Sequence, residues 1–179
     1  MQDFRNRVAV ITGGGGGIGA AMAHAFAREG MRIVLADVEQ DAMEKTAASI
    51  GGDVLAVRTD VSKLDDVVAL ADRAFAHFGA VHLLCNNAGV GAFGGLELVT
   101  YRDWQWVLGV NLWGVIHGIE AFVPRMIAQG QGGHIINTAS MSGLVPMQGF
   151  GVYVTSKYAV VGLSETLHRD LIQYGIGVS

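Results

Sequence analysis

The sequence holds one cysteine, Cys85, and two prolines among 179 residues. A single cysteine cannot form an intrachain disulfide, which excludes a small secreted module held together by such bridges. So little proline excludes a proline-rich linker and a collagen-like chain. A packed core is expected instead, because a chain of this length buries roughly 70% of its unfolded surface.

Charged residues are also scarce, at 16% of the chain against a usual ~25%. The chain carries 12 Lys and Arg against 16 Asp and Glu, a net charge of −4. It therefore lacks the basic face that displaces counterions from a nucleic acid, and no nucleic-acid partner is expected. The low charge indicates large buried faces, including surfaces between subunits.

Long apolar runs are absent too. No run reaches the ~18 residues of a membrane-spanning helix, so no membrane partner is expected. Arg5 and Arg7 before the apolar residues 8–11 resemble the start of a signal peptide, but the glycines at 13–17 interrupt it. No other targeting motif is visible, and the cytoplasm is the expected location.

Short β-branched runs alternate with longer helical patterns along the whole chain. The expected strands are 8–11, 32–36, 54–58, 81–85 and 134–137, and the expected helices are 18–29, 40–49, 64–78, 102–128 and 154–174. This alternation predicts one α/β domain over residues 1–179, a doubly wound parallel sheet. Residues 175–179 read as a sixth strand in or after which the sequence is cut off, so a C-terminal part is expected to be absent.

Glycines stand between the first strand and the first helix, in Thr12-Gly13 and in Gly17-Ile18-Gly19. Without a Cβ, the backbone can approach a pyrophosphate, and the helix N-terminus supplies free N–H groups. The strand–turn–helix context favours a dinucleotide site over a merely flexible turn.

Asp37 closes the second expected strand. A carboxylate there accepts hydrogen bonds from adenosine ribose hydroxyls and repels a 2′-phosphate. Neither Gly16 nor Val38 supplies a compensating base. The pattern predicts NAD(H) over NADP(H), the alternative being a plain solvated Asp at a strand end.

Two further strand ends carry polar groups. Asp60 follows the third strand, and Asn86-Asn87-Ala88-Gly89 follows the fourth. Ligands bind outside the carboxyl ends of such strands. Each could equally be a helix cap or a turn residue.

Tyr153 and Lys157 lie four apart on an expected helix and therefore share one face. An ammonium beside a phenol favours the phenolate, which makes Tyr153 usable as an acid or base near neutral pH. Ser140, at the end of the fifth strand, is placed to hold a substrate oxygen, with Ser142 as its competitor. Asn111 lies on an apolar helix stripe, where it either bonds the backbone or holds a water that leads to Lys157.

These residues, in this order, resemble the short-chain dehydrogenase/reductase family from Arg7 to Ser179. The resemblance implies a Rossmann-type fold and a nicotinamide-dependent oxidoreductase with four catalytic residues: Asn111, Ser140, Tyr153 and Lys157. By the same resemblance, Tyr153 is the general acid/base, Lys157 bonds the nicotinamide ribose, Ser140 polarises the substrate oxygen and Asn111 supports a proton relay.

The cofactor contacts implied by the resemblance follow the same motifs. They are Thr12, Gly13, Gly17, Ile18, Gly19, Asp37, Asp60, Val61, Asn87, Ala88, Gly89, Tyr153 and Lys157. Asp60 would bond the adenine amino group.

The expected substrate contacts are Ser140, Leu144, Met147 and Tyr153, and the apolar ones favour an apolar alcohol or ketone. Family members often pair through two long helices, here 102–128 and 154–174, so a homodimer or homotetramer is expected. The histidines show no metal-ligand spacing, and no metal is expected.

The predicted function is NAD(H)-dependent interconversion of a secondary alcohol and a ketone on a small, hydrophobic substrate. Two alternatives stay open. One is an NADPH-dependent 3-oxoacyl reductase, against which Asp37 speaks. The other is a non-catalytic nucleotide-sensing protein of the same fold.

Overall fold

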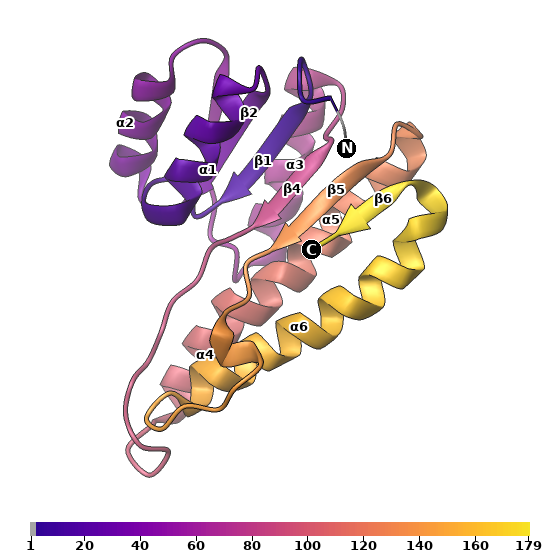
Figure 1. Ribbon diagram of the computed structural model, residues 1–179. Coiled ribbons are helices and arrows are strands. Elements are labelled where there is room, and N and C mark those ends of the chain that lie inside the picture. The colour runs from indigo at the N-terminus through magenta and orange to yellow at the C-terminus, as the bar shows by residue number, and fades with distance from the viewer. Residues whose placement is uncertain (1–2) are drawn as a thin grey trace.

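The computed structural model describes residues 3–179 and contains one parallel sheet. The strands are β1 (Val8–Thr12), β2 (Arg32–Asp37), β3 (Val54–Arg58), β4 (Leu83–Asn86), β5 (Gly133–Asn137) and β6 (Ile176–Val178). Their order is β3-β2-β1-β4-β5-β6, so the winding reverses between β1 and β4. Figure 1 shows the strands fanning across the upper half of the molecule. The predicted doubly wound parallel sheet is confirmed.

Helices connect successive strands. They are α1 (Gly17–Arg28), α2 (Gln40–Ile50), α3 (Leu64–Phe78), α4 (Tyr101–Leu108), α5 (Gly114–Gln129) and α6 (Gly151–Leu171). The helix expected over 102–128 is continuous in extent, but Gly109–Trp113 form a π-helical segment between α4 and α5. The helix expected over 154–174 begins earlier, at Gly151, and its last turn, Ile172–Tyr174, is 3-10.

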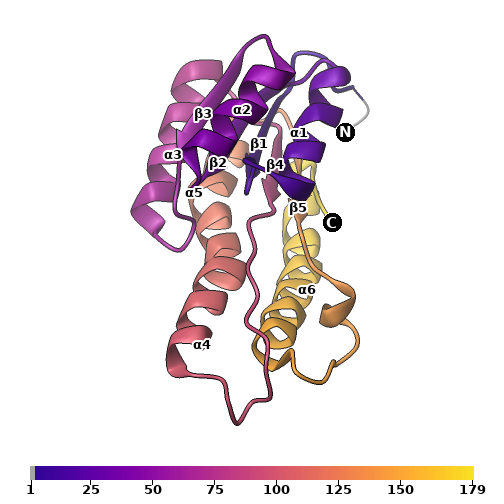
Figure 2. The ribbon, with the colours of Figure 1, turned by 90° about the vertical axis from the view of Figure 1, so that its left-hand side faces the viewer.

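Two apolar cores cover the faces of the sheet, because successive side chains of a strand point to opposite sides. Val8 and Val10 of β1 pack with residues of α3, α5 and α6. Ala9 and Ile11 pack on the other face with residues of α1 and α2. Figure 2 shows α3 and α5 lying together on one side of the sheet and α1 on the other.

The apolar helical run 101–129 is long and apolar enough, by length and composition alone, to cross a membrane. Within it, α5 buries Phe122 and Met126 completely in the core. Packing against the sheet therefore accounts for its apolar character, as in the core helix of a globular domain.

A second part of the molecule extends beyond the carboxyl edge of the sheet. Figure 1 shows α4, the first turns of α6 and the loops after β4 and β5 there. The two loops are joined, since Gly94 N–H donates to the Gly149 carbonyl at 2.9 Å. The rings of Phe93 and Phe150 also meet edge to face, with centroids 4.9 Å apart. This part forms one wall of the site described next.

Candidate active site

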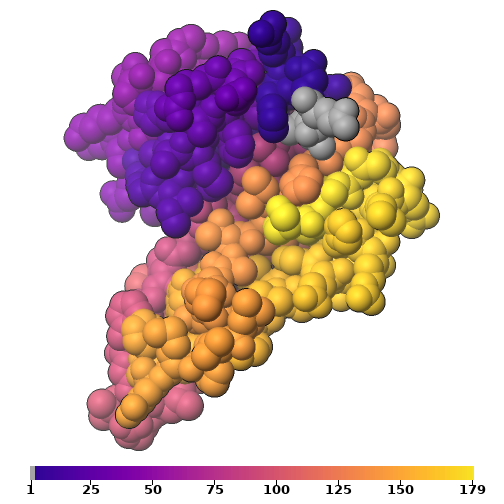
Figure 3. All heavy atoms as spheres, in the orientation of Figure 1, coloured from indigo at the N-terminus to yellow at the C-terminus, as the bar shows by residue number. Residues whose placement is uncertain are grey.

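A cavity of about 1090 Å³ lies at the carboxyl ends of the strands. It is lined from the loops after β1 to β5 and from the start of α6. Figure 3 shows the molecule hollowed between the indigo N-terminal part and the pink and orange part below it. Such a place, beside the reversal of strand order, is where sheets of this kind bind ligands.

The glycine loop forms the floor of the cavity. Gly13 and Gly17 have positive φ, +67° and +54°, which favours glycine at both positions. Gly17 faces open space, whereas a Cβ on Gly19 would collide with the Gly13 carbonyl oxygen. Gly13, Gly17 and Ile18 therefore line the cavity, while Gly19 is buried and allows α1 to approach the turn.

Thr12 connects the ends of the two central strands. Its buried Oγ1 accepts hydrogen bonds from the backbone N–H of Asn87 at 2.9 Å and of Ala88 at 3.1 Å. The Asn87 side-chain amide donates to the Thr12 carbonyl. Thr12 is not among the lining residues, so the structure gives it the task of holding Asn87 and Ala88 at the cavity wall, where Gly89 also lies.

The Asp37 carboxylate is fixed from two sides. Its Oδ2 accepts from Gly15 N–H at 2.8 Å, and its Oδ1 accepts from Glu39 N–H at 3.1 Å. Asp37 and the exposed Val38 both line the cavity. Along the described lining, Lys157 is the one basic side chain, so no cation neighbours Asp37 there.

Asp60 shapes the turn after β3. Its Oδ1 accepts from the Ser62 hydroxyl at 2.7 Å and from Ser62 N–H at 3.1 Å, and Lys63 lies 3.3 Å from its Oδ2. The bond from the Ser62 hydroxyl, helped by Lys63, lowers the pKa of Asp60. Asp60 therefore acts as a turn residue in the structure, one of the roles expected from the sequence. A contact between Asp60 and adenine stays a prediction. Asp60 and Val61 line the cavity.

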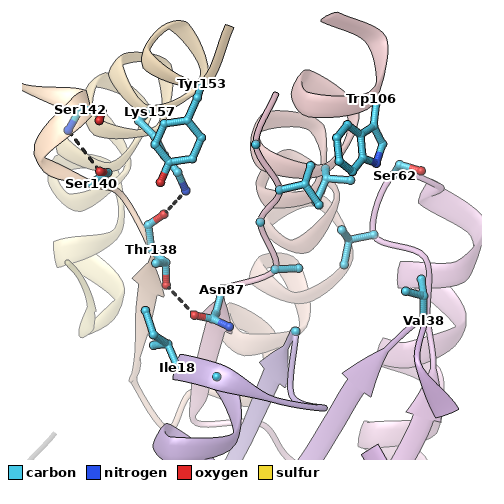
Figure 4. Close-up of a pocket in the computed structure, with 18 of the residues that line it drawn as sticks. Ile18, Val38, Ser62, Asn87, Trp106, Thr138, Ser140, Ser142, Tyr153 and Lys157 are labelled. Atoms are coloured by element: carbon cyan, nitrogen blue, oxygen red, sulfur yellow. Dashed lines mark hydrogen bonds between the residues drawn. The ribbon is translucent and has the colours of Figure 1, made fainter. Parts of the chain in front are cut away.

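Lys157 and Tyr153 occupy the opposite wall. Lys157 is buried, its Nζ donates to the Thr138 carbonyl, and it lies 5.5 Å from the centre of the Tyr153 ring. Burial lowers the pKa of the Lys157 ammonium. Figure 4 shows Tyr153, Lys157 and Ser140 gathered on one side of the cavity.

Ser140 and its competitor Ser142 are distinguished by their partners. The Ser140 Oγ accepts from Ser142 N–H at 3.1 Å, and no bond from its own hydroxyl hydrogen is present among the described residues. Ser142 is buried, and its hydroxyl donates to the Met147 sulfur. Of the two, Ser140 has the hydroxyl that is available for a ligand oxygen.

Asn111 is almost completely buried in the π-helical segment. Its Oδ1 accepts from Val90 N–H at 2.8 Å, and its Nδ2 donates to the Val90 carbonyl at 2.9 Å and to Ser156 Oγ at 3.1 Å. The side chain thus bonds the backbone, which was one of the two expected roles. A water relay from Asn111 stays a prediction. π-Helical turns are frequent at functional sites.

Several lining residues escaped the sequence analysis: Phe93, Trp106, Val110, Thr138 and Met141. Thr138 directly follows β5, so the strand-end rule could have found it. The aromatic residues carry no local signal, because only the folding of the loops brings them together. Leu144, an expected substrate contact, is 64% exposed and is not part of the lining, whereas Met147 is.

Neither cysteine nor metal chemistry is indicated in residues 3–179. Cys85 is buried in β4, and burial raises the pKa of its thiol to about 12. No group of three or more His, Cys, Asp or Glu side chains in this range could hold a metal ion.

The chain belongs to the short chain dehydrogenase family, whose model matches residues 7–179. It is 43% identical to the C alpha-dehydrogenase of Sphingobium sp., covering 100% of this chain and 60% of that protein. It is 39% identical to the putative oxidoreductase SadH of Mycobacterium tuberculosis, covering 96% and 63%. The chain thus spans about three fifths of these curated relatives.

Solved structures support the same family assignment. The fold matches a short chain dehydrogenase/reductase from Burkholderia phymatum in complex with NAD, with a TM-score of 0.97 and 49% identity over 100% of this chain and 66% of that one. The residues present here fit a nicotinamide dinucleotide. Gly16 and Gly17 leave open space for phosphates, and an acid and a lysine stand on opposite walls of the cavity.

Proposed function

We propose that the chain is the cofactor-binding domain, over residues 1–179, of an NAD(H)-dependent oxidoreductase that interconverts a secondary alcohol and a ketone. The observation that carries this proposal is the placement of Tyr153, Lys157 and Ser140 on one wall of a cavity whose floor is a glycine loop. Family membership supports the oxidoreductase class.

Side chains of this protein accept, donate and relay the proton of the reaction. In oxidation the Tyr153 phenolate accepts the proton of the substrate hydroxyl, and in reduction the phenol donates it. Lys157 places a positive charge beside the Tyr153 ring, and Ser140 donates a hydrogen bond to the substrate oxygen. Asn111 supports a proton relay through water towards Lys157. When bound, the nicotinamide cofactor gives or takes the hydride.

The cofactor preference rests on Asp37. Its carboxylate is held rigidly by two backbone N–H groups and is placed to accept the adenosine ribose hydroxyls. A 2′-phosphate would meet this negative charge with no cation beside it on the described lining. This arrangement favours NAD(H) over NADP(H) and speaks against an NADPH-dependent 3-oxoacyl reductase.

The substrate side of the cavity supports an apolar alcohol or ketone. Beside Ser140 and Tyr153 the lining includes Phe93, Met147 and Phe150. Such side chains bind a ligand mainly by removing apolar surface from water. One structural neighbour is named an NAD+-bound xylitol dehydrogenase, so the fold also accepts a more polar alcohol.

We also propose that copies of this protein pair in the cytoplasm through α4, α5 and α6 as a homodimer or homotetramer. Trp113, in the π-helical segment between α4 and α5, is 52% exposed, and Tyr158 of α6 is 43% exposed. Large exposed aromatic side chains are enriched at such interfaces.

Calorimetric titration of the chain with NADH and with NADPH tests the cofactor assignment. We expect NADH to bind at least about tenfold more tightly, a difference of ~1.4 kcal/mol. Equal binding, or binding that favours NADPH, would overturn the Asp37 argument and promote the 3-oxoacyl reductase.

Tyr153→Phe separates an enzyme from a nucleotide sensor. The variant removes only the phenolic hydroxyl, so an enzyme loses turnover and keeps its affinity for NADH. Oxidation of a panel of secondary alcohols by the parent and the variant, followed at the absorbance of NADH, is the measurement. A parent chain that binds NADH and turns over no alcohol or ketone would favour the sensor.

A further inference from the structure

The hydrogen bonds within the loop after β3 fix the shape of its turn. They do not fix how far Val61 lies from the cavity. Within the turn, Asp60 bonds Ser62, and the Asp60 N–H donates to the Asp66 carboxylate at 3.0 Å. These bonds join residues of one short segment to each other and to the start of α3. A contact with another element is needed to hold Val61 against the cavity.

His117 of α5 supplies that contact. Its Nδ1 lies 2.8 Å from the carbonyl oxygen of Val61. A carbonyl oxygen only accepts hydrogen bonds, so the proton of this bond belongs to Nδ1. The bond joins residues that are 56 positions apart in sequence.

Glycines bring the two segments close enough for this bond. A Cβ on Gly114 would lie 2.8 Å from Val61 Cγ2, and a Cβ on Gly109 would lie 3.5 Å from Ser62 Cβ. The loop therefore rests on the helix along the face that holds Gly109, Gly114 and His117. In this contact the imidazole is the polar group that can set the position of Val61.

His117 itself stays away from the ligand. It is half-buried and is not among the lining residues, whereas Val61 is buried and lines the cavity. The Trp113 ring packs beside the imidazole, with centroids 5.9 Å apart. His117 can affect a ligand only through Val61.

We propose that His117 is a positioning residue for the adenosine end of the cofactor cleft, where its Nδ1–H holds the Val61 carbonyl and thereby fixes the wall formed by Asp60 and Val61. This inference rests on the proposed function and on the predicted contact of Asp60 and Val61 with the adenosine of NAD(H). It predicts an effect on that half of the cofactor alone.

Three substitutions at His117 test the position of the donor. In His117→Asn, the side-chain Nδ2 takes the approximate place of the imidazole Nδ1. In His117→Gln the amide nitrogen lies nearer the place of Nε2, and His117→Leu has no donor. The probes are ADP-ribose for the adenosine half and nicotinamide mononucleotide for the other half, titrated calorimetrically with the parent and each variant.

We expect the Leu and Gln variants to bind ADP-ribose about fivefold to tenfold more weakly, as the loss of one hydrogen bond allows. Binding of nicotinamide mononucleotide stays unchanged, and His117→Asn restores ADP-ribose binding to within about twofold. If the weaker binding came only from a general loss of packing, it would not depend on where the side-chain donor lies, and the Asn and Gln variants would behave alike. If His117→Leu fails to fold, as thermal unfolding would show, the comparison of Asn with Gln carries the test.

Unchanged ADP-ribose binding in the Gln variant would overturn the positioning role. Equal losses for both probes, or no rescue by Asn, would also overturn it, since His117 would then support the domain as a whole. A parent chain that binds neither probe would instead remove the proposed function, and this inference with it.

Discussion

The side-chain amide of Asn111 and the backbone of Val90 bond each other twice, at 2.8 and 2.9 Å, and so fix the loop after β4 to the π-helical segment. Val90 lines the cavity, while Asn111 lies behind it. The same amide donates to Ser156, whose hydroxyl donates to the Tyr153 carbonyl. One buried side chain thus connects the loop after β4 with the turn of α6 that carries Tyr153.

Asn111→Leu is expected to destabilise the chain by about 2–4 kcal/mol, because the Val90 N–H and carbonyl both lose their partner. Turnover also falls, since the loop and the turn that carries Tyr153 lose their connection. Urea unfolding and initial rates measure the two effects. Ser156→Ala is the matched control and should cost only about 1 kcal/mol. Equal unfolding free energies for the Leu variant and the parent would contradict the assignment.

The sequence predicted where Asn111 lies, but not what it bonds. Its position on an apolar stripe indicated burial, and buried amides need partners. Val90 is 21 residues away, in a loop without periodicity, so only tertiary packing selects it. The π-helical segment was missed for a related reason, because one widened turn barely disturbs a period of 3.6 residues.

The sheet was predictable almost in full, because apolar strands bounded by glycine, Asp or Asn leave few alternative boundaries. The fourth strand is the exception, since it begins at Leu83 and not at residue 81. There the Val81 N–H donates to the Gln129 side chain and not to a strand. Thr12 shows the same limit at the site, since its motif predicts a cofactor contact but its hydroxyl bonds the end of β4.

Lys157 is expected to lower the stability of the chain while supporting its activity. Its folded-state pKa is lowered by burial, so between that pKa and 10.5 the unfolded chain binds more protons than the folded one. The unfolding free energy of the parent therefore rises with pH through this window. Lys157→Met removes the titrating group, abolishes turnover and leaves stability at pH 7 equal or higher.

The measurement is urea unfolding of the parent and of Lys157→Met between pH 7 and pH 10.5. The difference between the two cancels the contribution of Cys85, which titrates in both chains. As pH rises, the unfolding free energy of the parent should increase relative to that of the variant. A constant difference would show that Lys157 carries no buried charge to relieve.

His82 is expected to make the chain sensitive to acid. Its Nδ1 accepts from Val8 N–H at 3.1 Å, and its Nε2 lies 2.8 Å from the Gln131 side-chain oxygen. Burial lowers the pKa of His82, and the charges of Arg7 and Arg32 add to this effect. The unfolded chain therefore binds the extra proton first, and stability falls as pH drops from 6.5 towards the folded-state pKa.

His82→Asn tests this account, because its Oδ1 can still accept from Val8 N–H but does not titrate. Urea unfolding from pH 8 to pH 5 should show the parent losing stability faster than the variant. His134, whose pKa burial also lowers, remains in both proteins and cancels. Parallel curves would assign the acid sensitivity to other groups.

Asp37→Ser is expected to reverse the cofactor preference by two separable effects. The serine removes the charge-assisted bonds to the ribose hydroxyls. Because each such bond contributes ~1.5–3 kcal/mol, NADH should bind more than about tenfold more weakly. It also removes the repulsion of a 2′-phosphate, so NADPH should bind more tightly than it does to the parent. Because Gly15 N–H loses its acceptor, the loop is checked by thermal unfolding.

Thr46→Ala, which removes a bond to the carbonyl of the same glycine, is the control for loop disorder. It should weaken both cofactors alike and leave their ratio unchanged. An Asp37→Ser variant that loses NADH and NADPH in equal proportion would mean that Asp37 supports the glycine loop and does not select the cofactor.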